Sequence, residues 1–170
     1  MLDQSPSKQA RTRGFLTMHG MLSQWYRPFE FGLEGSKVGY LLGMECGDFD
    51  YALYHANHFI AFALVSPVGL TEVESDVAIF CQQMQDFNMG TILTFTLPLW
   101  QFCLNLIGDG IDDPAGLSGE VMVLEEQEAS LKTHLLARTV IQLYQLQLAT
   151  LYDRFRLIEE ILSVFVANHE

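Results

Sequence analysis

Apolar residues recur at steps of three and four along most of this chain, and this spacing constrains the fold more than any other feature. The clearest example shares one face of a helix and consists of Val73, Val77, Phe80, Met84 and Phe87. No run of alternating β-branched residues with hairpin turns appears in the sequence. The pattern therefore predicts an all-α fold of about seven or eight helices, whose short connections favour antiparallel neighbours.

Proline, glycine and aspartate mark the ends of the first helices. Pro28 suits the first position of a helix over residues 29–45, and Gly47 suits the left-handed position that follows the helix. Asp48 can then cap a second helix over residues 49–65.

The next two helices are bounded by similar signals. Thr71 and Glu74 have the spacing of a capping box, and Asn88-Met89-Gly90 is typical of a helix end. Residues 91–107 form the most apolar element, with Pro98 inside it, where a proline is expected to kink a helix.

The remaining boundaries are less regular. Residues 108–117 have the composition of a loop, after which Ser118 can cap a helix that opens with Glu120. A further helix is expected over residues 134–151. The apolar stripe continues from Ile141 to Phe165, and periodicity alone would predict one long helix there.

Two regions follow from this reading: a polar, disordered tail over residues 1–13 and a helical-repeat domain over residues 14–170. Helical hairpins that cannot each bury their own apolar faces are the material of an α-solenoid, of which this domain would be a fragment.

Charge and cysteine content limit the possible partners. The formal net charge is -12, and the nine Lys and Arg residues are scattered. Such a charge disfavours nucleic acid and anionic membrane surfaces as partners. Three widely spaced cysteines suit a reducing compartment, so we expect a cytoplasmic protein.

The step Gly47-Asp48, followed by Ala52, resembles the turn between the two helices of a tetratricopeptide repeat. Ser36, Gly39, Tyr40 and Gly43 stand where that repeat has Trp, Leu, Gly and Tyr. From about residue 25 onward the chain more closely resembles the divergent tetratricopeptide-like region of giant multidomain signalling ATPases, which combine a protein kinase or cyclase domain, an AAA-type ATPase and often a sensor kinase. The residues that carry this resemblance are Gly47, Asp48, Ala52, Trp100, Gln101, Leu104, Asn105, Leu106, Gly108, Pro114, Leu117, Gly119 and Glu120.

The resemblance implies irregular antiparallel helical hairpins stacked as a tetratricopeptide-like α-solenoid. It also implies a turn near Asp153 in place of one long helix. The matched residues would be structural, with Trp100 buried where two hairpins meet. The implied function is a scaffold or protein-interaction module without catalysis or cofactor. Its partners would be other domains of the same signalling system or neighbouring repeats. Self-association through uncapped apolar ends is a separate expectation from the sequence.

Other functions are less well supported by the residues. His55 and His58 share one helix face, but zinc needs three or four ligands, and no second pair is suitably spaced. Asp109, Asp112 and Asp113 lie in one loop without the glutamate ligand of a calcium-binding loop. An enzyme with an unrecognised helical active site remains an alternative function.

Two further alternatives concern apolar and glycine-rich segments. Residues 51–71 and 87–108 carry no Asp, Glu, Lys or Arg and are long enough to cross a bilayer, so a small helical membrane protein is an alternative. Gly35, Gly39 and Gly43 recur at steps of four and predict close packing of another backbone, either inside the fold or, less favoured, in a docking groove.

Overall fold

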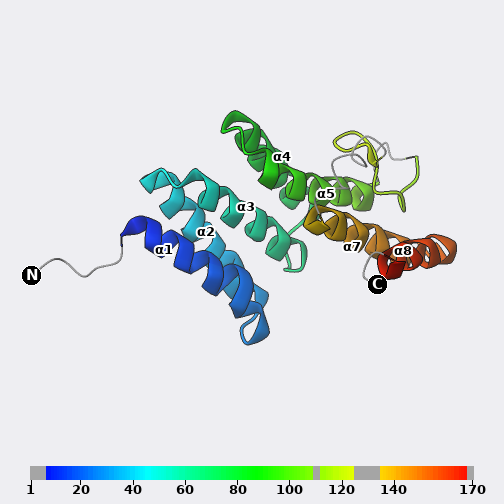
Figure 1. Cartoon of the computed structure of the whole chain (residues 1–170), viewed down its shortest axis with the longest axis horizontal. Coiled ribbons are helices and arrows are strands. Elements are labelled where there is room, and N and C mark those ends of the chain that lie inside the picture. The colour runs from blue at the N-terminus through cyan, green and yellow to red at the C-terminus, as the bar shows by residue number, and fades with distance from the viewer. Residues whose placement is uncertain (1–6, 109–111, 125–134, 168–170) are drawn as a thin grey trace, which may run out of the picture. The chain divides into compact units, whose positions relative to one another are not determined.

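A computed structural model of the chain describes residues 7–108, 112–124 and 135–167 (Figure 1). Every regular element in these ranges is helical and none is a strand, which confirms the all-α prediction. The chain divides into two compact units, and the boundary between Leu93 and Thr94 falls inside one helix. Each unit is described by itself.

The first unit is built around a helical hairpin. Its elements are α1 (Lys8–Phe15), the π-helical η1 (Leu16–Leu22), the short 3₁₀ segment η2 (Ser23–Trp25), α2 (Phe29–Cys46), α3 (Phe49–Leu64), α4 (Leu70–Asp86) and the start of α5 (Gly90–Ile107). α2 packs most extensively against α3, and α1 and α4 pack against this hairpin from other sides. The core beside α4 contains Leu53, Ala56, Met84 and Ile92.

The turn between α2 and α3 forms as its residues predict. Gly47 has a φ of 74°, the left-handed conformation expected after a helix, and the backbone N–H of Asp48 donates to the Gly43 carbonyl at 2.9 Å. Pro28 precedes α2 at the N-cap position, one residue before the predicted place. Asp48 occupies the N-cap of α3, but its side chain makes no capping bond.

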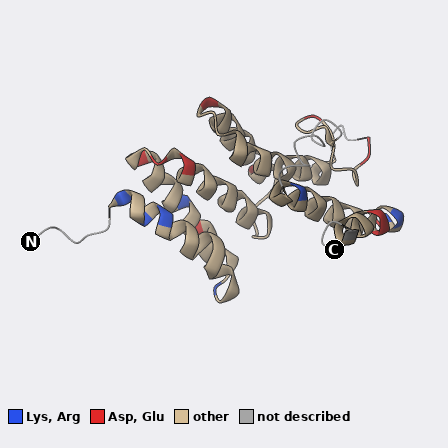
Figure 2. Cartoon of the chain, in the orientation of Figure 1, with Lys and Arg blue, Asp and Glu red and all other residues tan. Residues whose placement is uncertain are grey.

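Asp48 instead connects the hairpin to α1. Arg13 donates from Nε to Oδ2 of Asp48 at 3.1 Å, and Lys8 forms an ion pair with Glu45. Figure 2 shows basic positions along α1 and acidic positions at the start of α3. The tail prediction for residues 1–13 is therefore wrong for residues 8–13, which form a helix that packs on α2; residues 1–6 lie outside the described residues.

The capping box predicted at Thr71 and Glu74 is also wrong. α4 begins at Leu70, with Gly69 at the N-cap, so Thr71 already lies within the first turn. The Gly69 carbonyl accepts from the N–H groups of Glu72 and Val73 at 2.9 and 3.0 Å. The predicted end of this helix is correct, because Asn88 takes a left-handed φ of 56° two residues after α4.

The second unit contains the rest of α5 followed by α7 (Leu135–Leu151) and α8 (Phe155–Ala167). Asp153 has a φ of 55°, and the turn around it separates α7 from α8 as the resemblance implied. Residues 118–123 are not helical, so the helix expected to open with Glu120 is absent there. Ser118 accepts from the Leu124 N–H at 3.1 Å. Residue 134, the predicted start of the following helix, lies outside the described residues.

Among the described helices, α5 alone is long and apolar enough to cross a membrane by length and composition, and Pro98 lies within it. The core helix of a soluble protein meets the same criterion. Several polar side chains of α5 are fully buried, namely Thr96, Gln101 and Asn105.

Candidate functional site

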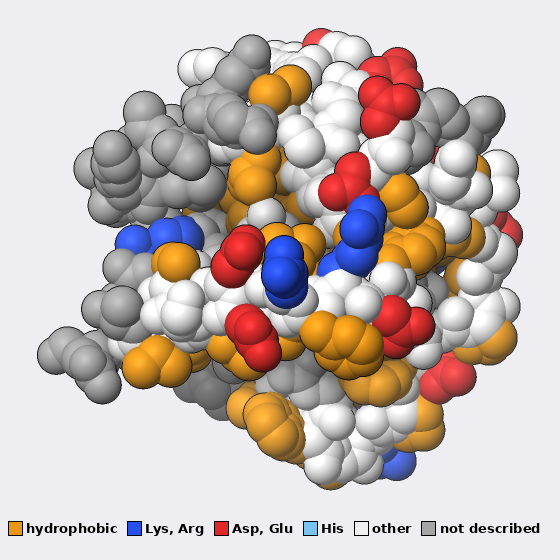
Figure 3. Space-filling view, turned by 90° about the vertical axis from the view of Figure 1, so that its right-hand side faces the viewer, with side chains coloured by type: hydrophobic (Ala, Val, Ile, Leu, Met, Phe, Trp, Pro, Cys, Tyr) orange, Lys and Arg blue, Asp and Glu red, His pale blue; other side chains and the backbone are white. Residues whose placement is uncertain are grey.

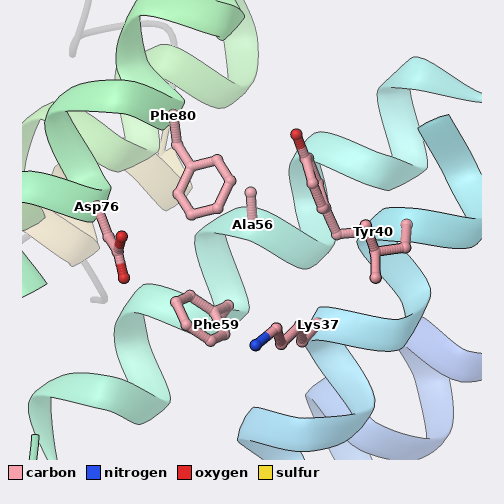
Figure 4. Close-up of a pocket in the computed structure, with 7 residues that line it drawn as sticks. Lys37, Tyr40, Ala56, Phe59, Asp76 and Phe80 are labelled. Carbon is pink, nitrogen blue, oxygen red and sulfur yellow. The ribbon is translucent and has the colours of Figure 1, made fainter.

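A groove of about 220 Å³ lies between α2, α3 and α4 of the first unit (Figure 4). α2 contributes one wall, α3 the floor and α4 the opposite wall. The lining residues are Lys37, Tyr40 and Leu41 from α2, Ala56 and Phe59 from α3, and Asp76 and Phe80 from α4. Ala56 is fully buried, and its small side chain leaves room above α3 for the groove.

Three aromatic rings give the groove its apolar surface. The rings of Tyr40 and Phe80 meet edge to face with centroids 5.3 Å apart, and those of Phe59 and Phe80 do so at 6.1 Å. The Tyr40 hydroxyl donates to Oε1 of Gln83 at 2.9 Å, which connects α2 directly to α4. Because each ring is held by its neighbours, the groove is formed before any ligand arrives.

Two opposite charges flank these rings. Lys37 stands on α2 and Asp76 on α4, both directed toward the groove (Figure 4). Neither side chain makes a hydrogen bond or ion pair with another described residue. Partial burial, together with the nearby charge of Glu72, raises the pKa of Asp76, while Lys37 acts in the opposite direction. Asp76 is thus a carboxylate whose charge is incompletely compensated.

The two histidines predicted on one face of α3 lie outside the groove. His55 is fully buried, and its Nε2 donates to the Thr12 carbonyl at 2.9 Å. Its Nδ1 has no hydrogen-bond partner. His58 donates from Nδ1 to the Tyr54 carbonyl at 2.9 Å. Burial lowers the pKa of both side chains, which favours neutral imidazoles.

Potential metal ligands do not converge in the part of the chain that the structure describes. No group of three His, Cys, Asp or Glu side chains there could hold a metal ion. In the loop considered for calcium, Asp113 accepts from Arg154 and from the Ala115 N–H, at 3.0 and 3.2 Å. Asp109 lies outside the described residues.

The glycine stripe on α2 is occupied by side chains of the same unit. A Cβ atom at Gly39 would lie 2.1 Å from the His55 ring, and one at Gly35 would lie 2.0 Å from the His19 ring. Gly43 leaves space for Ala52 in the same way, at 2.8 Å. Internal packing, the favoured of the two predictions, is confirmed, and the docking-groove reading of this stripe is wrong.

In the second unit, several residues of the resemblance motif form one hydrogen-bonded group. Gln101 and Asn105 are fully buried on α5, and Nε2 of Gln101 donates to Oδ1 of Asn105 at 2.8 Å. Nδ2 of Asn105 donates to the carbonyls of Pro114 and Gly116 at 3.1 and 2.6 Å. The Val121 N–H donates to Oε1 of Gln101 at 3.3 Å. These amides hold the loop that follows α5 against that helix.

The remaining residues of the resemblance motif differ in their burial and backbone conformation. Leu117 is fully buried, and Gly119 lies so close to Gln101 that a Cβ there would be 2.6 Å from Nε2. Gly108 ends α5 with a φ of 79°. Trp100 is only partly buried, whereas burial at a junction of hairpins was predicted, and Leu104 is likewise partly buried. Glu120 is exposed.

Sequence reasoning missed the groove. Only Phe80 among its lining residues had been placed in an apolar stripe, and nothing in the order of residues indicated that Lys37 and Asp76 face the same space. Comparison with protein-family models, with curated proteins and with solved structures gives no match for this chain.

Proposed function

We propose that the chain is a non-catalytic helical scaffold that binds a segment of another protein in the groove between α2, α3 and α4. The observation that carries this proposal is the groove itself, preformed by three aromatic side chains and open beside exposed Leu41. Aromatic side chains on a preformed surface supply large contact areas with little loss of conformational freedom, as interaction sites require.

The chemistry of the groove favours binding over catalysis. An enzyme site is expected to bring several titratable groups with shifted pKa values together in one pocket. Here Asp76 is the single carboxylate in the lining, and the buried histidines lie elsewhere. Burial raises the pKa of Cys81 to about 12 and that of Tyr144 to about 12, so neither is ionised near neutral pH.

The wider setting of this scaffold follows from the resemblance. We infer a tetratricopeptide-like solenoid in a cytoplasmic signalling system of the ATPase type, in which the partner is another domain of that system or a neighbouring repeat. The α2–α3 hairpin, closed by Gly47, supports this proposal because its tight turn is the part of the repeat that the sequence matches best.

A peptide selection with two matched variants tests the proposal. Peptides are selected on the full chain from a random library displayed on phage, and their affinities are measured for Leu41→Lys and Val38→Lys. Leu41 lines the groove and is 58% exposed, whereas Val38 lies on the same helix outside the groove and is 43% exposed. Both changes add one positive charge to an exposed apolar position.

Selected peptides should lose most of their affinity for Leu41→Lys and retain it for Val38→Lys. Equal losses in both variants, or none in either, would place the binding surface elsewhere and contradict the proposal. Circular dichroism and thermal unfolding of both variants establish that the fold is retained.

A further inference from the structure

The rings and charges of the groove together favour one kind of side chain. The faces of aromatic rings carry negative potential and attract cations, most strongly where water is partly excluded. Tyr40, Phe59 and Phe80 provide three such rings within one groove. A cation placed among them would also approach the carboxylate of Asp76, which makes no hydrogen bond or close ion pair with another described residue.

The charges around the groove also favour a cationic ligand. Glu72 stands close enough to Asp76 to raise its pKa, so α4 presents two acidic side chains on this side. Lys37 is the single basic side chain in the lining. The whole chain carries a net charge of -12, which raises the local concentration of cationic segments and accelerates their association.

An anionic occupant fits the groove less well. A carboxylate could bind Lys37, but it would face the negative ring surfaces and the acidic side chains of α4. Lys37 is exposed, and a lysine ammonium is strongly hydrated, so a single pair with it contributes little. A purely apolar occupant would cover the Asp76 carboxylate further without supplying it with a new counter-charge.

We propose that the groove is a receptor for an arginine side chain of the bound segment, with the guanidinium against the Asp76 carboxylate and its plane stacked on the aromatic rings. This inference rests on the proposed interaction function and specifies its ligand. Arginine fits better than lysine because its planar, weakly hydrated head group stacks on rings and binds a carboxylate through two parallel hydrogen bonds. The groove volume of about 220 Å³ exceeds what several water molecules need, so a long side chain can enter.

Methyl NMR on the full chain tests the proposal with three small probes. The probes are N-acetyl-arginine methylamide, N-acetyl-norleucine methylamide and N-acetyl-glutamate methylamide, each titrated at physiological ionic strength. The reporters are the methyl groups of Ala56 and Leu41, which both line the groove. The arginine compound should shift these signals at the lowest concentration, the norleucine compound at a higher one and the glutamate compound at the highest.

Two variants that change the charge of the groove sharpen the test. Asp76→Asn should weaken binding of the arginine compound several-fold, and Lys37→Gln should strengthen it because a competing cation is removed. Asp50→Asn is the control for the change in net charge, since Asp50 is an exposed residue on the first turn of α3 outside the groove, and it should leave the affinity unchanged.

The possible outcomes distinguish failure of the arginine proposal from failure of the proposed interaction function. Stronger binding of the glutamate compound than of the arginine compound would overturn the arginine proposal in favour of an anion receptor. Equal binding of the arginine and norleucine compounds would overturn it while leaving an apolar interaction groove in place. Absence of binding by all three would also overturn it, whereas the interaction function fails if the selected peptides lose equal affinity for Leu41→Lys and Val38→Lys, or none for either.

Discussion

Imidazole rings pack against glycine backbone in the first unit. His19 packs on Gly35, His55 on Gly39 and His58 on Gly20, and each of these glycines would place a Cβ within 2.7 Å of the ring it faces. A glycine in a helix costs roughly 1 kcal/mol relative to alanine. This cost is offset because the absence of a side chain at each glycine leaves space for an imidazole ring between the packed segments.

Gly39→Ala is therefore expected to destabilise the protein although alanine is the better helix former. The new methyl group would overlap the His55 ring, which is fully buried and tied to the Thr12 carbonyl, so it cannot move aside easily. Overpacking of this kind costs about 1–3 kcal/mol, and we expect a net loss of about 1–2 kcal/mol after the gain in helix propensity. Urea unfolding measures the change.

Gly14→Ala is the matched control for this substitution. Gly14 lies in α1, with nothing within 4 Å of an added Cβ, so the same substitution should stabilise the protein by up to about 1 kcal/mol. If both variants were stabilised equally, the close contact between Gly39 and His55 would not exist in solution.

His55 also makes stability depend on pH. Burial lowers the pKa of His55 below the ordinary 6.5. A proton added at Nδ1 would also find no hydrogen-bond acceptor, because this nitrogen has no partner. The bond to Thr12 raises the pKa, and nearby His19 and His58 lower it. The unfolded chain thus binds a proton more readily than the folded protein, so stability is full above the unfolded pKa and falls as the pH drops through it.

We expect the free energy of unfolding to decrease between about pH 7 and pH 5.5, where most carboxylates remain ionised. His55→Gln should flatten this dependence, although its absolute stability will be lower. His58, whose pKa is also lowered by burial, accounts for the slope that remains. Urea unfolding at closely spaced pH values gives both slopes, and identical slopes in the two proteins would show that His55 does not titrate abnormally.

At the scale of the elements, local signals predicted some boundaries and missed others. Gly47 was predictable because a left-handed residue after a helix has a strong preference for glycine. The start of α4 was not, because the helix already begins at Leu70 with Gly69 at its N-cap, which places Thr71 inside the first turn. The polar composition of α1 does not indicate a helix. The ion pair that holds it, from Arg13 to Asp48, joins residues far apart in the sequence.

The groove was hidden for a related reason. Its residues come from three helices, and periodicity assigns each to a face without indicating which faces meet. Whether Lys37 and Asp76 face the same space depends on how α2 and α4 are rotated about their axes. That rotation is set by packing on α3, and no local pattern encodes it.

The amide pair of α5 supports a prediction about the second unit. Asn105→Ala would leave the carbonyls of Pro114 and Gly116 and the amide of Gln101 without their partner. Each buried polar group left unsatisfied costs about 1–3 kcal/mol, so we expect a loss in that range or somewhat above it. Hydrogen exchange should show faster exchange at the Val121 N–H, which Gln101 binds.

Gln147→Ala is the control for this variant because Gln147 lies on α7 and is exposed. Its stability should stay within about 0.5 kcal/mol of the parent protein. If Asn105→Ala were equally neutral, the loop after α5 would be held by its apolar contacts, chiefly through Leu117, and the amide pair would be dispensable.

At the scale of the whole molecule, both units leave apolar side chains in contact with solvent. In the first unit they include Trp25, which is 81% exposed, together with Met18, Met21, Leu22, Tyr26 and Phe29. In the second unit they lie at the end of α7 and along α8, and include Leu151, Phe155, Leu162, Val164 and Val166. Figure 3 shows hydrophobic side chains between acidic and basic ones on one face of the molecule.

Exposed apolar surfaces of this kind mark interaction sites, and we expect the chain to self-associate through them. The charge of -12 opposes association, but it is screened within about 8 Å at physiological ionic strength. Sedimentation velocity should therefore show a mean mass that rises with protein concentration and rises further with added salt.

Trp25→Ser and Leu162→Ser each remove apolar area from one unit and should reduce the association, whereas Gln24→Ser, beside Trp25, should not. A chain that stays monomeric at high micromolar concentration in high salt would contradict the prediction. Such a chain would have to cover the apolar face of α8 by itself, and so would form a closed helical bundle in place of an open array.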